Sequence, residues 1–202
     1  PGWHIECSAM SLRHLGETLD IHGGGQDLVF PHHENEIAQS EAFTGMAPFA
    51  KYWLHNGFVR MGSEKMSKSL GNLVTLGDAL SRFGADAIRL FILSSHYRSP
   101  LTYSEEGLAA AQKGVDRLVA ALRIVAQGGG QREGEELDSD RYRELFIEAM
   151  DDDFNTAHAV RVLFSLARDI NRARERGTRV GQGQETLREL AGVLGFVLKE
   201  EE

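Results

Sequence analysis

Apolar residues recur every three to four positions through most of the second half of the chain. One such run follows Ser104 and predicts a long amphipathic helix, because this period places the apolar side chains on one face. Its apolar positions are Leu108, Ala111, Val115, Leu118, Leu122 and Val125. Further helices are expected at about 140–150, 154–176 and 183–198. A succession of amphipathic helices of this kind predicts an antiparallel helical bundle.

The first half instead shows short apolar runs among Gly, His and aromatic residues. A helix is expected at 32–43, because Pro31 suits the first turn of a helix. Short strands are expected at 19–22, 52–59 and 73–75. Alternation of short strands and helices predicts an α/β layer.

We therefore predict a fold of class α/β plus α. Two short helices, at 78–83 and 86–95, are expected to connect the two halves. The Gly-rich, acidic stretch at 127–140 is expected to be a flexible connection. The predicted division is an α/β part at 1–75, connecting helices at 76–126 and a helical bundle at 127–202.

The length and net charge of the chain limit the classes of protein to which it can belong. The 202 residues are enough for one large domain or two modest ones with a buried core. The net charge of −8 argues against a protein that binds nucleic acid mainly through its overall positive charge. It is still compatible with a local basic face. No apolar run is long enough to span a membrane, and one cysteine cannot form an internal disulfide, so we expect a cytoplasmic protein.

The segment Lys65-Met66-Ser67-Lys68-Ser69 places two ammonium groups beside two hydroxyls, just before a glycine turn. Lysine acts on phosphate as a mobile point charge, and such charges help most where negative charge develops during a reaction. The segment therefore suits a triphosphate. A solvated basic turn would use the same residue types, so the five residues alone leave both interpretations open.

Cys7, His32 and Glu36 are candidate metal ligands. His32 and Glu36 are four residues apart, so on a helix they project from the same face. Thiolate, imidazole and carboxylate form a plausible zinc set, with a fourth position left for another ligand or a substrate. The structural alternative is a buried core cysteine beside an ordinary His/Glu contact on a helix surface.

The glycines at 23–25, followed by Asp27, suggest a ligand-binding turn. Three glycines let the backbone pass close to a flat or bulky ligand, and the following carboxylate can accept hydrogen bonds from ribose hydroxyls. This is not the dinucleotide-binding fingerprint, and a plain turn would have the same composition. His22, His32 and His33 flank the segment.

Taken together, these segments resemble the cysteinyl-tRNA synthetases, a family of class I aminoacyl-tRNA synthetases. The matching stretches are GWHIECSAM at 2–10, LDIHGGGQDLVFPHHENEIAQSEA at 19–42, EKMSKSLGN at 64–72, FGADAIRLFILSSHYRSPLTYSEE at 83–106 and DDDFNTAHAV at 151–160. The resemblance covers nearly the whole chain. It implies the later part of a Rossmann-like catalytic domain followed by a helical bundle domain.

The resemblance implies that Cys7, His32 and Glu36 are ligands of a zinc ion that binds the thiolate of the substrate cysteine. Zinc favours a soft thiolate, so the hydroxyl of serine would be a much poorer ligand. Because serine cannot form the zinc–thiolate bond, cysteine can be preferred over serine by a high ratio without an editing site.

Roles for the other motifs follow from the same resemblance. Trp3 matches the floor of the amino-acid pocket, and His22 matches a catalytic-site histidine that lines it. Gly24 and Asp27 match positions that hold the adenosine part of ATP, which reacts with magnesium bound. Lys65 and Lys68 match catalytic lysines that stabilise its phosphates, within an ATP-binding loop that includes Met66 and Ser67. The helices at 76–202 match the part of the family that touches tRNA.

Three departures from the family pattern bear on activity. The family's HIGH motif, which contacts ATP, does not occur in the sequence. A further cysteine ligand would lie before residue 1, and Pro1-Gly2 does not resemble a natural start. The family's small anticodon-binding domain would begin about where the sequence stops. We therefore expect a fragment that is inactive alone, with weakened zinc affinity and a partly open sheet through which copies could self-associate.

Two alternatives stay open at this point. A truncated paralogue could have lost catalysis and kept zinc, cysteine or partner binding. A related enzyme family uses the same adenylation but passes cysteine to an amino sugar, and it shares the zinc and KMSKS regions. The sequence at 153–157, DFNTA, resembles the tRNA enzyme more closely.

Overall fold

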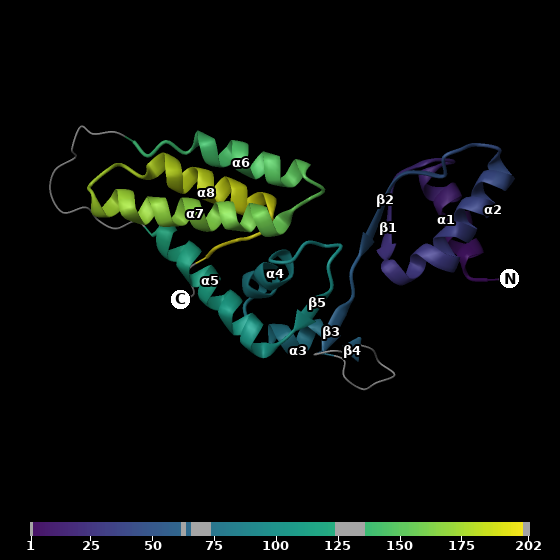
Figure 1. The fold of residues 1–202 in the computed structure, drawn as a ribbon, viewed down its shortest axis with the longest axis horizontal. Helices are drawn as coiled ribbons and strands as arrows, with labels where there is room; N and C mark the ends of the chain where they lie inside the picture. Colours follow the sequence, from purple (N-terminus) through teal and green to yellow (C-terminus); the bar gives the residue numbers. More distant parts are fainter. Residues whose placement is uncertain (1, 62–63, 66–73, 124–135, 200–202) are drawn as a thin grey trace. The chain divides into compact units, whose positions relative to one another are not determined.

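The structure is a computed structural model that describes residues 2–61, 64–65, 74–123 and 136–199. The chain divides into two compact units (Figure 1). Unit 1 comprises Pro1–Val59 and Arg98–Leu101, and unit 2 comprises Arg60–Tyr97 and Thr102–Glu202. In the described part of the chain, no helix combines the length and apolar character needed to cross a membrane.

Unit 1 is a small α/β layer. Its elements are α1 (His4–Leu15), β1 (Leu19–Gly25), the short 3-10 turn η1 (Gln26–Leu28), the π-helical turn η2 (Val29–His33), α2 (Glu34–Thr44) and β2 (Ala50–Asn56). Strands β1 and β2 are parallel, in a register that runs from Leu19 opposite Ala50 to Gly25 opposite Asn56. Parallel strands need a crossover, which η1, η2 and α2 provide here.

The core of unit 1 is small, and much apolar surface stays exposed. Leu19, Phe49 and Ala50 form its buried cluster. On β1 and β2, Ile21 is 61% exposed and its register partner Tyr52 is 67% exposed. A patch of paired apolar side chains on a two-stranded sheet is a surface suited to association.

Most residues of a three-stranded sheet, in the order β4-β3-β5, belong to unit 2. These strands are β3 (Val59–Met61), β4 (Glu64–Lys65) and β5 (Leu101–Tyr103). The helices are α3 (Leu76–Leu80), α4 (Ala85–Leu93), α5 (Glu105–Leu122), α6 (Asp140–Asp151), α7 (Thr156–Glu175) and α8 (Gly181–Val193). Side chains fix several helix starts: Thr75 and Asp78 form a capping box on α3, Ser104 caps α5 and Asn155 caps α7.

The apolar faces of α4 to α8 share one core. Its fully buried side chains include Leu118 on α5, Leu163 and Ile170 on α7, and Leu187 on α8. Helices α6, α7 and α8 contact one another and lie side by side in Figure 1. The sequence pattern therefore predicted this part of the fold correctly.

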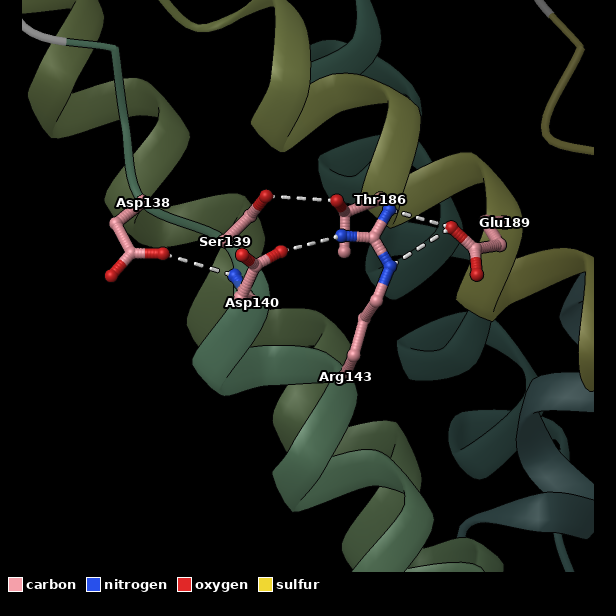
Figure 2. A network of polar contacts seen from close by, with 6 residues as sticks. All are labelled: Asp138, Ser139, Asp140, Arg143, Thr186 and Glu189. Carbon is pink, nitrogen blue, oxygen red and sulfur yellow. Dashed lines mark hydrogen bonds and ion pairs between the residues drawn. The ribbon is translucent and has the colours of Figure 1, made fainter.

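A polar network joins the start of α6 to α8 (Figure 2). Ser139 and Thr186, both fully buried, share a hydroxyl–hydroxyl hydrogen bond of 2.8 Å. Nearer the surface, Arg143 donates to Glu189 at 2.7 Å and to Asp140 at 3.1 Å. Because every buried hydroxyl in this pair has a partner, the network fixes α6 against α8 without an unsatisfied polar group.

The α/β plus α class is confirmed, while several element boundaries were wrong. Helix α1 was not predicted, since its buried face is short and Ser8 is its only buried residue in the described structure. Val74 and Thr75 are not in a strand, because Thr75 caps α3 instead. Strand β1 continues through the glycines at 23–25, where a loop was expected. Leu73 and most of the expected connection at 127–140 lie outside the described residues.

Candidate metal centre and its surroundings

Glu36 lies at the centre of the cluster of polar side chains in unit 1. It sits in the first turn of α2, and its side chain has no exposed surface. The Nε2 atom of His22, at the middle of β1, is 2.6 Å from Glu36 Oε2. The Nε2 atom of His32 is 3.0 Å from Glu36 Oε1. The strand and the turn before α2 thus bring two imidazoles onto one buried carboxylate.

Cys7 joins this cluster from α1. Ligand atoms of Cys7, His32 and Glu36 all lie within 4.8 Å of one another. Although His32 is close to Glu36, neither His32 Nδ1 nor Glu36 Oε1 has a hydrogen-bond partner among the described residues. Buried polar atoms are normally satisfied, so these unpaired atoms within one group of candidate ligands indicate that the group can accept a metal ion. Thiol, imidazole and carboxylate fit zinc.

The protein surroundings of Cys7 favour its protonated thiol. Burial raises the pKa of Cys7, and the nearby Glu36 carboxylate raises it further. A metal ion would reverse this preference, because a coordinated thiol is deprotonated.

A second group, His22, His33 and Glu36, also has ligand atoms within 4.8 Å of one another. His33 Nδ1 lies 2.8 Å from His55 Nε2 on β2. Burial lowers the pKa of His33 to about 4, and the neighbouring His22 lowers it as well. His33 is therefore neutral near pH 7, and its Nδ1 can either donate to His55 Nε2 or accept from it.

Sequence analysis missed His55 and Trp53. The ring of Trp53 lies edge-on to His22, with centroids 4.8 Å apart. Both residues owe their position to the β1–β2 register, which sets His22 opposite Trp53 and Gly24 opposite His55. A correct register would have identified them, whereas their positions in the sequence alone gave no signal.

Trp3, expected on the floor of an amino-acid pocket, stacks directly on His32. The ring centroids are 3.9 Å apart and the planes differ by 16°. Trp3 is 59% exposed, so its other face is open to solvent or to a ligand. The structure therefore places Trp3 and His22 next to the candidate metal ligands; their roles in binding or catalysis stay predictions.

Gly24 and Asp27 lie at the end of β1 and in η1. A Cβ atom at position 24 would lie 2.8 Å from His33 Cε1 and 2.9 Å from Leu28 Cδ1. The side chain of Asp27 turns back over Gly25, whose added Cβ would lie 2.5 Å from Asp27 Oδ1. Close packing thus explains the glycine at 24, while its predicted contact with adenosine stays a prediction.

The KMSKS segment is described only at its first residue. The backbone of Lys65 pairs with Arg60 in the antiparallel β3–β4 ladder. Met66, Ser67 and Lys68 lie outside the described residues. The phosphate-binding roles predicted for Lys65 and Lys68 are therefore not tested.

Comparison with known families decides the assignment. The family model for the tRNA synthetases class I (C) catalytic domain matches residues 1–113, and that for the DALR domain matches residues 145–199. The chain belongs to the class I cysteinyl-tRNA synthetase family. The two matched models cover a catalytic part and a following helical part of the chain.

Curated relatives carry the same family name. A cysteine–tRNA ligase of Dehalococcoides mccartyi strain 195 is 60% identical over 98% of this chain, which is 43% of its own length. The corresponding enzyme of Heliobacterium modesticaldum is 52% identical over 98% of the chain and 45% of its own length. The chain therefore spans less than half the length of these relatives.

Two solved class I synthetases share the fold. A LeuRS of Agrobacterium radiobacter K84, solved with tRNA and LeuAMS, matches 88% of this chain and 28% of its own at a TM-score of 0.58 and 18% identity. The methionyl-tRNA synthetase of Mycobacterium tuberculosis was solved with methionyl-adenylate. The match covers 89% of this chain and 40% of that synthetase, with a TM-score of 0.53 and 20% identity. These likenesses support the synthetase fold alone.

A substitution at Gly24 is expected to disturb the pair His33 and His55. Gly24→Ala would push a methyl group against His33, which is buried and held by His55, so we expect a loss of about 1–3 kcal/mol in unfolding free energy. Gly23→Ala is the matched control, because its Cβ would meet only Leu54 O, at an ordinary 3.6 Å. Urea unfolding followed by tryptophan fluorescence measures both. Equal stability of the two variants would contradict the packing argument.

Proposed function

We propose that the chain is the part of a cysteine–tRNA ligase that selects cysteine and contacts tRNA. The full reaction joins cysteine to ATP to form cysteinyl-adenylate and pyrophosphate, and then transfers the cysteinyl group to tRNA. The observation that carries this proposal is the cluster of Cys7, His32 and Glu36 with its unpaired buried atoms. Residues 1–75, 76–126 and 127–202 would be the partial catalytic, tRNA-stem-contacting and bundle domains.

Zinc would be held by Cys7, His32 and Glu36. When bound, zinc would supply a soft Lewis-acid centre that accepts the thiolate of the amino acid. The protein would fix the orientation of its ligands: His22 holds the second oxygen of Glu36, and Trp3 covers the ring of His32. Metal ligands whose orientation is fixed by neighbouring side chains bind a metal more tightly than ligands without such neighbours.

ATP, with magnesium bound, would be held by residues of the glycine segment and of the KMSKS segment. Gly24 and Asp27 would hold the adenosine, with the carboxylate of Asp27 available to ribose hydroxyls. Lys65 and Lys68, with Met66 and Ser67 in the same motif, would place positive charge on the phosphates as the cysteine carboxylate attacks the α-phosphate. The sequence has no HIGH motif, so the 202 residues alone are expected to be inactive in adenylate formation.

The test of the proposal is linkage between zinc and cysteine. With one expected ligand lacking, the chain should hold about one zinc weakly, and added cysteine should tighten zinc binding by offering a further thiolate. Serine and alanine should have no such effect. Zinc titrations with a competing chelator, at fixed concentrations of each amino acid, measure this. Equal effects of cysteine and serine would overturn the proposal.

Catalysis itself is tested separately by cysteine-dependent ATP–pyrophosphate exchange. We expect exchange at the background level for the 202 residues, combined with zinc-linked cysteine binding. Exchange above background would mean that residues in this chain replace the HIGH motif. Loss of both exchange and cysteine binding would favour a non-catalytic paralogue with another partner.

Self-association through unit 1 is a further part of the proposal. The exposed pair Ile21 and Tyr52 on β1 and β2 provides apolar surface for a second copy. Sedimentation at increasing concentration should show dimers, and Tyr52→Lys should return the protein to monomers. A monomer at all concentrations would contradict this part and leave the cysteine proposal untouched.

A further inference from the structure

Unit 1 holds a second group of candidate metal ligands, which the proposed function does not use as a metal site. We name this group, His22, His33 and Glu36, the histidine set; its ligand atoms lie within 4.8 Å of one another. We name Cys7, His32 and Glu36 the thiol set. Both sets lie in unit 1, and Glu36 is the residue that they share. Two imidazoles and a carboxylate are donors that zinc and similar divalent ions accept.

The two oxygens of Glu36 face different sets. Oε1 lies 3.0 Å from His32 Nε2, in the thiol set, whereas Oε2 lies 2.6 Å from His22 Nε2, in the histidine set. The side chain is fully buried, and among the described residues no lysine or arginine pairs with it. A buried carboxylate needs positive charge beside it, because taking an unpaired ion out of water costs several kcal/mol. The geometry thus allows Glu36 to offer one oxygen to an ion in each set.

The surroundings of His33 suit a metal ligand. A Cβ atom at Gly24 would lie only 3.0 Å from His33 Nε2, so the glycine keeps the space beside this nitrogen free of a side chain. The other ring nitrogen, Nδ1, lies 2.8 Å from His55 Nε2. A histidine that binds a metal usually holds its second nitrogen in a hydrogen bond, which fixes the ring and its tautomer. His55 can do this for His33 by accepting from Nδ1, which leaves the lone pair on Nε2.

We propose that the histidine set binds a second divalent metal ion, which Glu36 bridges to the ion of the thiol set. This inference rests on the proposed function, which makes the thiol set a zinc site. The second ion would take the place of the proton between His22 Nε2 and Glu36 Oε2. Two cations beside one buried carboxylate repel each other, so the second ion should bind more weakly than the first.

Cobalt(II) distinguishes the two sets, because only a thiolate ligand gives a sulfur-to-cobalt charge-transfer band in the near ultraviolet. Titration of the unmodified 202-residue chain with Co²⁺ should show two bound equivalents. The tighter equivalent should bring the charge-transfer band. The weaker one should add only the visible bands of cobalt bound to nitrogen and oxygen. Competition with a chelator gives the affinity of each.

His33→Asn tests the histidine set, because asparagine lacks an atom in place of Nε2 while its amide can still hydrogen-bond in place of Nδ1. This variant should keep the tighter equivalent and its band. It should weaken the second equivalent by more than about 100-fold, since even the loss of an outer partner costs about 10–100-fold. His14→Asn is the matched control, because His14 is exposed and belongs to neither set. Circular dichroism checks that both variants fold, and His22→Asn replaces His33→Asn if the latter does not.

Two further variants test the bridge. Glu36→Gln should weaken both equivalents, because each ion would lose an oxygen of the same carboxylate. Cys7→Ser should remove the charge-transfer band and leave the equivalent that depends on His33. Weakening of only one equivalent by Glu36→Gln would overturn the bridge.

The outcomes separate this inference from the proposed function. A single equivalent that has the band and is unaffected by His33→Asn would overturn the inference and leave the proposed function standing. Two equivalents that both survive His33→Asn would also overturn it, because the second ion would then lie elsewhere on this acidic chain. Cobalt bound only through His33, without the band, would contradict the proposed function and the bridge together.

Discussion

Glu36→Gln is expected to lower zinc affinity by more than about 100-fold while the chain stays folded. Loss of an outer-shell partner alone typically costs about 10–100-fold in metal affinity, so loss of a ligand charge should cost more. Glutamine has nearly the shape of glutamate, and the fully buried site therefore keeps its packing. It lacks the negative charge that offsets the metal cation, and its amide nitrogen cannot act as a ligand.

The matched control is Glu34→Gln on the same helix. Glu34 is exposed, in the first turn of α2, and belongs to neither candidate ligand group among the described residues. Competition with a chromophoric chelator gives the zinc affinity of each variant, and thermal melts in the presence of a chelator check the fold. If Glu36→Gln holds zinc as tightly as the control, Glu36 is not a ligand and the cluster has a structural role.

The sequence predicted the candidate ligands better than it predicted their surroundings. His32 and Glu36 were expected on one helix face, yet His32 belongs to a π-helical turn and Glu36 to α2. The spacing still worked, because a turn that runs directly into a helix preserves the proximity of residues four apart. His55 and Trp53 were not predicted, since their contacts depend on which residues of β1 and β2 stand opposite each other. Register is set by tertiary packing, so the sequence of a single short strand gives little indication of which residues will stand opposite it.

In the fold as well, elements with local sequence signals were predicted and elements without them were not. Helices α5 and α7 were predicted nearly to their ends, because a long apolar period and the caps Ser104 and Asn155 are local signals. Helix α1 was not, because its apolar residues do not form a buried stripe: Ile5 is 43% and Met10 54% exposed. A helix whose apolar side chains lie mostly at the surface resembles an irregular segment when periodicity is the only signal.

Leu163→Ala should lower the unfolding free energy of unit 2 by about 2–5 kcal/mol. Leu163 lies at the middle of α7 and is fully buried in the core that α4 to α8 share. Removing its isobutyl group loses the transfer free energy of the buried atoms and leaves a cavity that rigid neighbouring helices can fill only in part. Alanine is the best helix former, so none of the loss would come from helix propensity.

Val193→Ala is the control for this prediction, because it also shortens an aliphatic side chain at a helical position. Val193 is the last residue of α8 and is 64% exposed, so its truncation should change stability by less than about 0.5 kcal/mol. Urea unfolding followed by far-ultraviolet circular dichroism reports mainly on the helical unit. A cost below about 1 kcal/mol for Leu163→Ala would mean that α7 is not held by this core.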